Sequence, residues 1–148
     1  MGEENGTHVW LVLFKAARAV QRNAEGSISS LGIGLSDFAV LEMLLHKGPQ
    51  PVNRIGHKIL LSSGSITAAV DRLEARGLVR RTVDPGDLRA RIVQLTARGR
   101  RLIQRAFARH ALDVEETMAV LGPGERKDLV RLLKKLGLWA AARSEPGI

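Results

Sequence analysis

The chemistry that this sequence can perform is concentrated in its arginines. Between residues 72 and 109 the chain carries eleven arginines and no lysine, against three carboxylates, Glu74, Asp84 and Asp87. The flanking segments 1–71 and 110–148 are each balanced, so this middle part accounts for the whole formal net charge of +8. Because the planar guanidinium fork suits phosphate oxygens and guanine edges, the segment predicts a polyanionic partner, nucleic acid above all. The alternative is a basic face that is merely solvated.

A hydroxyl-rich turn stands directly before this segment. Ser62-Ser63-Gly64-Ser65 precedes an apolar repeat at helical spacing over residues 66–73. A helix that begins here offers free backbone N–H groups and a partial positive charge to phosphate. Serines at a helix start are often only caps, but the neighbouring arginines make four residues candidate DNA contacts: Ser63, Ser65, Thr67 and, further along the helix, Arg72.

Hydrophobic periodicity predicts the elements that position these groups. Four helices are expected from Thr7 to about Ile28, from a Ser36 cap to Gly48, from Pro51 to Leu61, and from the serine-rich turn to Gly77. Two short strands follow, at 79–82 and 91–95, with a connection longer than a two-residue hairpin loop. A long helix capped by Thr96 then runs to about Leu121, and a last amphipathic helix follows Gly122-Pro123-Gly124.

This order predicts a mainly α fold with a small β hairpin, in which a winged helix-turn-helix domain is joined to an α-helical dimerisation region. Within a single domain, 1–148, the winged helix-turn-helix lobe spans 36–95 and the dimerisation region 7–30 and 96–142. The helix after the turn would lie in the major groove. Arg89 and Arg91 of the hairpin would reach flanking phosphates or the minor groove.

The sequence of the hairpin resembles that of the MarR family of bacterial regulators. The likeness lies in Leu73–Arg81 and Asp84–Thr96, which contain the complete wing signature D-x-R-x-x-x-V-x-L-T as Asp87, Arg89, Val93, Leu95 and Thr96. It extends over about residues 7–142 and implies a dimer that binds palindromic promoter DNA and usually represses. It also implies that Asp87 braces the wing while Arg89 touches DNA. Ala68 departs from the pattern, because many relatives carry arginine there.

The resemblance further implies dimer contacts and a small aromatic or phenolic effector. The apolar residues expected in the dimer interface are Val9, Leu13, Leu129, Leu132, Leu133, Leu136 and Trp139. The residues expected to line an effector pocket are Trp10, Phe14, Phe38 and His46, for which plain packing is the alternative. The stretch from Gly48-Pro49-Gln50-Pro51-Val52 through Ile66-Thr67 is similar to a branch associated with quinone or hydroquinone response.

Other classes of function find little support in the residues. The chain has no cysteine, which excludes disulfides, thiolate metal sites and a thiol redox switch, and its four histidines are scattered, so no metal is expected. No nucleophile elbow or phosphate-binding loop occurs, so neither catalysis nor a cofactor is expected. The apolar run Val9–Phe14 is too short to cross a bilayer, and we expect a cytoplasmic protein. The alternative function is an architectural DNA-binding or protein-interaction winged helix without an effector.

Overall fold

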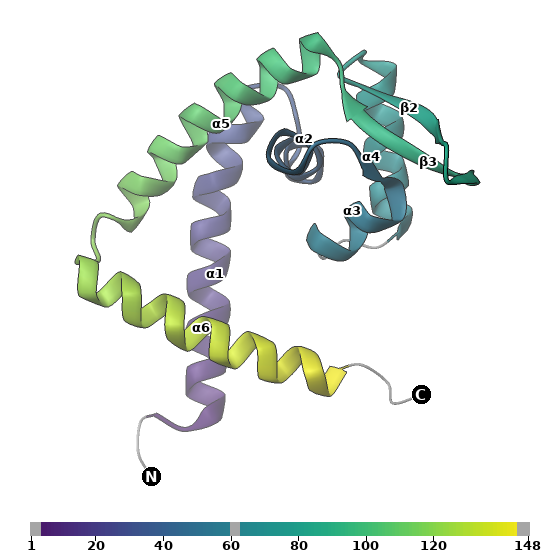
Figure 1. Cartoon of the computed structure of the whole chain (residues 1–148). Helices are drawn as coiled ribbons and strands as arrows, with labels where there is room; N and C mark the ends of the chain where they lie inside the picture. Colours follow the sequence, from purple (N-terminus) through teal and green to yellow (C-terminus); the bar gives the residue numbers. More distant parts are fainter. Residues whose placement is uncertain (1–3, 60–62, 145–148) are drawn as a thin grey trace. The chain divides into compact units, whose positions relative to one another are not determined.

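The computed structural model describes residues 4–59 and 63–144, which form helices and one small sheet (Figure 1). In chain order the elements are α1 (Gly6–Ser29), α2 (Leu35–Lys47), β1 (Gln50–Pro51), α3 (Val52–Ile59), α4 (Ser63–Ala75), β2 (Val79–Asp84), β3 (Asp87–Leu95), α5 (Ala97–Met118) and α6 (Pro123–Ser144). They confirm the mainly helical fold class. Two compact units, Met1–Val114 and Glu115–Ile148, divide the chain within α5. No helix of the described residues is long and apolar enough to span a membrane.

Helices α2 and α4 end where glycine was expected to end them, but α1 and α2 begin earlier than predicted. Gly48 and Gly77 take positive φ angles of 75° and 69° behind α2 and α4. The predicted cap at Thr7 is wrong, because Asn5 caps α1 by accepting a hydrogen bond from the His8 N–H at 2.9 Å. The Ser36 cap is also wrong: α2 begins after Gly34, without a side-chain cap.

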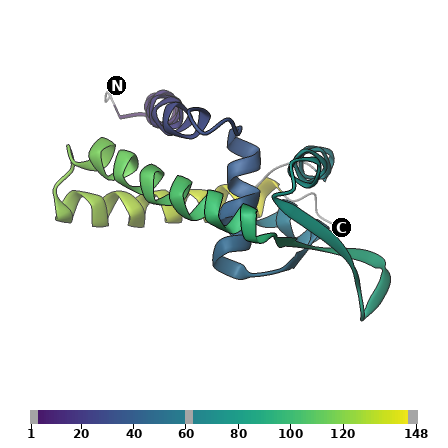
Figure 2. The ribbon, with the colours of Figure 1, turned by 90° about the horizontal axis from the view of Figure 1, so that it is seen from above.

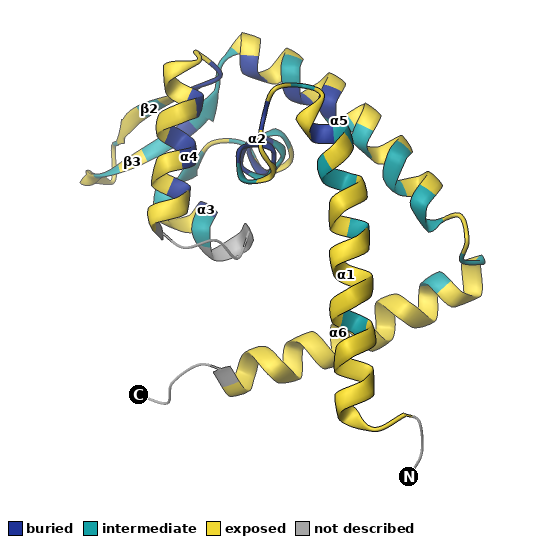
Figure 3. Ribbon diagram, turned by 180° about the vertical axis from the view of Figure 1, so that it is seen from behind, coloured by how far each residue is buried: buried dark blue, intermediate teal, exposed yellow. Residues whose placement is uncertain are grey.

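The core of the first unit lies where α2, α3 and α4 meet the sheet. Figure 3 shows buried positions along the inner sides of α2 and α4. Apolar residues recur there at helical spacing, and the largest fully buried ones include Leu41, Leu44, Ile55, Ile66, Val70, Leu73 and Val93. This packing fixes which side of α4 faces outward.

The sheet has the strand order β1-β3-β2, and all its pairs are antiparallel. The hairpin is longer than predicted, since β3 already begins at Asp87 and only Pro85 and Gly86 connect the two strands. Hydrophobic alternation did not predict the pairing of β2 with β3 near the hairpin tip, because the side chains there are exposed. The two-residue strand β1, which pairs Gln50 with Val93, was not predicted either, because so short a segment has no periodicity.

Two hydrogen bonds join Thr96, which stands between β3 and α5, to the segment between α4 and β2. Figure 2 shows from above how α5 continues from the sheet. Thr96 Oγ1 accepts from the Gly99 N–H at 3.0 Å, which confirms the predicted cap. The same hydroxyl donates to the Gly77 carbonyl at 2.7 Å, and the Thr96 N–H donates to the Leu78 carbonyl at 3.1 Å. Gly99 packs directly on the backbone of Leu78.

The second unit contains the end of α5 and the whole of α6. Glu125 accepts a hydrogen bond from the Gly122 N–H at 2.8 Å, and Arg126 binds the Leu121 carbonyl at 3.1 Å and Glu115 at 2.5 Å. α5 therefore ends at Met118, before the predicted limit. The remainder of α6 exposes large apolar side chains: Leu129, Val130, Leu132, Leu133, Leu136, Leu138 and Trp139.

Candidate nucleic-acid interface

The outward side of α4 carries the residues that sequence analysis singled out. Ile66, Ala69 and Val70 are buried, which turns Ser65 and Thr67 toward the exposed side of the helix. The Ser63 side chain lies outside the described residues. An exposed first turn with hydroxyl groups is what a helix needs to enter the major groove of DNA.

Arg72 on α4 is paired with a carboxylate of α2. Its guanidinium binds Asp37 through contacts of 2.6 and 3.4 Å, and it lies 3.5 Å from the Ser36 hydroxyl. The Asp37 side chain is only 8% exposed, whereas that of Arg72 is 52% exposed. The hydrogen bond to Asp37 and the charge of that carboxylate raise the pKa of Arg72. The pair therefore joins α4 to α2 through a largely buried anion.

Arg81 on β2 joins the hairpin to α4, which sequence analysis did not predict. Its backbone N–H and one guanidinium nitrogen each bind Glu74 at 2.9 Å, and another nitrogen binds Asp71. Burial lowers the pKa of Arg81, but the hydrogen bonds and charges of Asp71 and Glu74 outweigh it and leave the pKa raised. Strand β2 and helix α4 are thus tied together by one side chain and its own backbone.

The hairpin tip is shaped by two carboxylates and presents two arginines. Asp84 accepts from the Gly86 N–H at 2.8 Å within the turn, and Asp87 accepts from the Arg89 N–H at 3.0 Å. Arg89 is exposed, and Arg91 is exposed while bonding to the carbonyls of Leu88 and Ala90, both at 3.2 Å. Asp87 is therefore placed to hold the backbone from which Arg89 projects.

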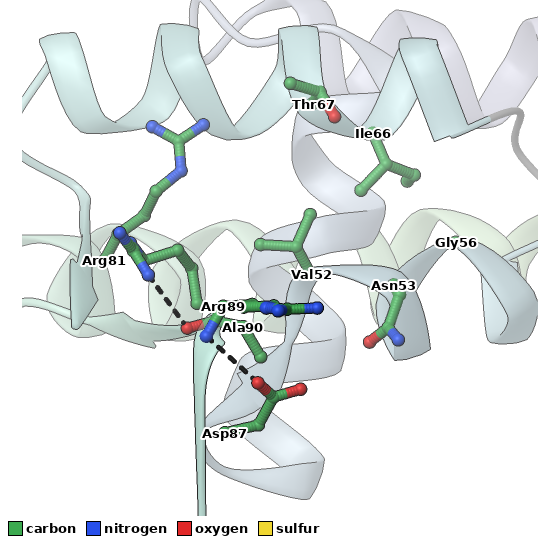
Figure 4. Close-up of a pocket in the computed structure, with 10 residues that line it drawn as sticks. Val52, Asn53, Gly56, Ile66, Thr67, Arg81, Asp87, Arg89 and Ala90 are labelled. Carbon is green, nitrogen blue, oxygen red and sulfur yellow. Dashed lines mark hydrogen bonds between the residues drawn. The ribbon is translucent and has the colours of Figure 1, made fainter. Parts of the chain in front are cut away.

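A groove lies where α3, α4 and the hairpin meet (Figure 4). It encloses about 730 Å³, and its lining residues are Val52, Asn53, Gly56, Ile66, Thr67, Arg81, Asp87, Arg89, Ala90 and Arg91. Sequence analysis predicted Thr67, Arg89 and Arg91 for this surface but missed the α3 contribution, because no charge or motif marks Asn53. The groove brings a hydroxyl of α4 and the guanidinium groups of the hairpin to one surface.

The four residues predicted for an effector pocket are found in three ring contacts and do not line this groove. Trp10 and Phe14 stack on each other on the exposed side of α1, with ring centroids 5.7 Å apart. Phe38 meets His110 edge-on at 4.9 Å, and His46 meets Phe107 at 4.8 Å. The residue pattern had not indicated the two α5 partners.

The His110 ring contains a buried polar atom without a partner. Its Nδ1 makes no hydrogen bond to any described residue. No group of three or more histidine or carboxylate side chains among the described residues could hold a metal ion.

Comparison with known proteins gives relatives of one kind. The model of the MarR family matches residues 33–90. The HTH-type transcriptional regulator MhqR of Bacillus subtilis (strain 168) is 39% identical over 137 residues, which cover 93% of this chain and 94% of the relative.

Solved structures agree with this fold. BpsR of Bordetella bronchiseptica, whose DNA binding is regulated by 6-hydroxynicotinic acid, is 25% identical with a TM-score of 0.80, over 93% of this chain and 96% of that chain. A mutant of MarR from E. coli in complex with operator DNA has a TM-score of 0.80 at 24% identity, over 86% and 92% of the two chains. The latter likeness is one of fold.

Proposed function

Because this chain belongs to the MarR family of DNA-binding transcriptional regulators, we propose that it binds an inverted-repeat operator in the cytoplasm as a homodimer and represses transcription there. The observation that carries the proposal is the groove in which α3, α4 and the hairpin converge. The first turns of α4 enter the major groove, with Ser63, Ser65 and Thr67 near bases or phosphates. Arg89 and Arg91 contact the flanking minor groove or phosphates, and Asp87 braces the wing.

Arg72 acts in this proposal mainly by positioning α4. Its pairing with Asp37 favours a positioning role over the direct DNA contact expected from the sequence, since a guanidinium held by a buried carboxylate is costly to release. The pair would set the rotation of α4 about its own axis. That rotation decides which hydroxyl groups face the bases.

Exposed apolar residues on α1 and α6 support a dimer. Val9 is 48% exposed, and Leu129, Leu132, Leu133, Leu136 and Trp139 are between 40% and 67% exposed. Apolar surface of this extent marks an interface with another chain. With Leu13 it would join two protomers about a two-fold axis, which places the recognition helices roughly 34–36 Å apart, one turn of the duplex.

A small aromatic or phenolic effector would release the operator. The regulation of BpsR by 6-hydroxynicotinic acid supports an aromatic ligand. Phe38 meets His110 edge-on, and the His110 Nδ1, which has no hydrogen-bond partner among the described residues, offers one to a ligand hydroxyl. Trp10, Phe14 and His46 remain the other predicted contacts. Titration with 6-hydroxynicotinate and with catechol, followed by release of bound DNA, tests this step, and a His110→Phe variant should lose the response.

A mobility-shift assay on the DNA upstream of the protein's own gene tests operator binding. We expect the protein to bind this upstream DNA far more tightly than a scrambled duplex at every salt concentration. Equal affinities for the two duplexes would favour the architectural alternative. Arg89→Ala should weaken operator binding by about 1–3 kcal/mol if the side chain reads a base. Lys127→Ala, which removes one exposed charge from α6, is the matched control. Light scattering should show a dimer for both variants. If Arg89→Ala binds the operator as tightly as the wild type does, the hairpin is not part of the DNA interface.

A further inference from the structure

One exposed side of α5 carries a row of arginines that the proposed operator contacts do not use. We define the arginine face of α5 as Arg98, Arg101, Arg105 and Arg109, which recur at helical spacing and are all exposed. Arg109 pairs with Asp113 at 3.3 Å. Within residues 4–59 and 63–144, the other three make no ion pair and no side-chain hydrogen bond.

The stability of the helix does not explain this row. Two of these arginines, Arg98 and Arg101, lie in the first turn and a half of α5, at the positive end of the helix dipole, and no acidic residue accompanies them in the first turn. Cations at that end are unfavourable. Arg101 and Arg105 are also four residues apart, as are Arg105 and Arg109, and like charges at this spacing repel each other. The row therefore costs the isolated helix stability, which an external anion would restore.

The composition of this face points to a phosphate backbone and not to a protein. In the fully described stretch 97–109 every exposed side chain is arginine, glutamine or alanine. No large apolar residue is exposed between residues 89 and 111, and the sequence has no carboxylate between Leu88 and Leu112. Protein interfaces carry an apolar or aromatic centre, whereas DNA interfaces are basic and polar. Duplex DNA fits this surface better than an acidic protein does.

The arginine face of α5 begins near the C-terminal end of α4, whereas the turn that would read the operator lies at the N-terminal end of α4. Thr96 and Gly99 fix the start of α5 against Gly77 and Leu78, just beyond the C-terminal end of α4. Figure 1 shows α5 leaving from this end, while α3 lies at the other. Since α4 has 13 residues, the two ends are about 20 Å apart. The arginine face therefore starts at the end of α4 that the operator-reading turn does not occupy.

We propose that the arginine face of α5 binds the phosphate backbone of a second DNA duplex, so that the protein can hold operator DNA and a separate duplex together. The binding is independent of sequence, because guanidinium groups on phosphates read no bases. The inference rests on the proposed function for the first duplex and goes beyond it for the second.

A capture experiment tests the second site separately from the first. The full-length protein is bound to a short operator duplex on beads, and a fluorescent duplex without an operator is added at increasing salt. We expect capture at low salt. The triple variant Arg98→Gln, Arg101→Gln, Arg105→Gln should capture at least tenfold less of the fluorescent duplex than the wild type. Its affinity for the short operator should be unchanged. The slope of log affinity for the second duplex against log salt should fall by about 2.7, from roughly 0.9 per phosphate contact.

A charge-matched control separates this site from a general effect of net charge. Lys127→Gln, Lys134→Gln, Lys135→Gln removes three exposed charges from α6 and should capture the second duplex as the wild type does. Circular dichroism checks that both triple variants fold. Wild-type protein that holds the operator but captures no second duplex overturns the proposal, and so does undiminished capture by the α5 variant. Binding of poly-glutamate through the same arginines without duplex capture would assign an acidic protein partner instead. Failure of the wild-type protein to bind the operator would contradict the proposed function and not the second site.

Discussion

Replacing Gly99 by alanine tests the junction at which α4, β2 and α5 meet. A Cβ at this position would lie 1.9 Å from the Leu78 carbonyl oxygen and 2.8 Å from the carbonyl carbon. Ordinary contact between such atoms needs about 3.5 Å, so the two backbones must separate by about 1.5 Å. Both neighbours are main chain, and no side chain can rotate to make room.

The expected loss of stability follows from two opposing effects. Overpacking a well-packed site costs about 1–3 kcal/mol, while alanine is favoured over glycine within a helix by roughly 0.5–1 kcal/mol. We therefore expect Gly99→Ala to lower the free energy of unfolding by about 1–2 kcal/mol. Gly26→Ala in α1 is the matched control, because a Cβ there meets nothing within 4 Å. This control should gain up to about 1 kcal/mol.

Urea unfolding followed by far-UV circular dichroism measures both variants. Wild type and variants are compared at one protomer concentration, because the stability of a dimer depends on it. A Gly99→Ala protein that unfolds at the wild-type urea concentration, or at a higher one, would refute the close approach of α5 to Leu78. Since Leu78 lies between α4 and β2, we also expect weaker operator binding from this variant.

The other predictions concern the pairs and faces that hold the lobe and the dimer. Asp37→Asn and Arg72→Ala should each weaken operator binding several-fold, and the double variant should bind no worse than either single one; a double-mutant cycle on operator affinity checks this coupling. Thr96→Ala should cost about 1 kcal/mol of unfolding free energy in urea, since it removes the cap of α5. Leu133→Asp combined with Leu136→Asp should give a monomer by light scattering and abolish operator binding, and a dimer would place the interface elsewhere.

Local signals in the sequence were sufficient for most of the fold. Gly48 and Gly77 end helices because only glycine adopts positive φ without strain, and Thr96 caps a helix through a neighbour three residues away. Such features depend on a few consecutive residues. The cap at Asn5 was missed because Thr7, two residues later, is also of a residue type that caps helices.

Contacts between distant segments could not be predicted in the same way. Asp37 and Arg72 are 35 residues apart, and nothing in either neighbourhood indicates the other. Arg81 belonged to a crowded set of arginines, so its carboxylate partners were not distinguishable from sequence. Arg72 was accordingly expected at DNA, although its guanidinium lies on a buried carboxylate. Charge located the surface, but packing decides which cations remain available to a ligand.

Arg81 gives the lobe a mechanical property. Three bonds from this residue join β2 to α4. We therefore expect the two elements that would contact the duplex to change orientation together. Moving β2 away from α4 would break the bonds of Arg81 to both Asp71 and Glu74.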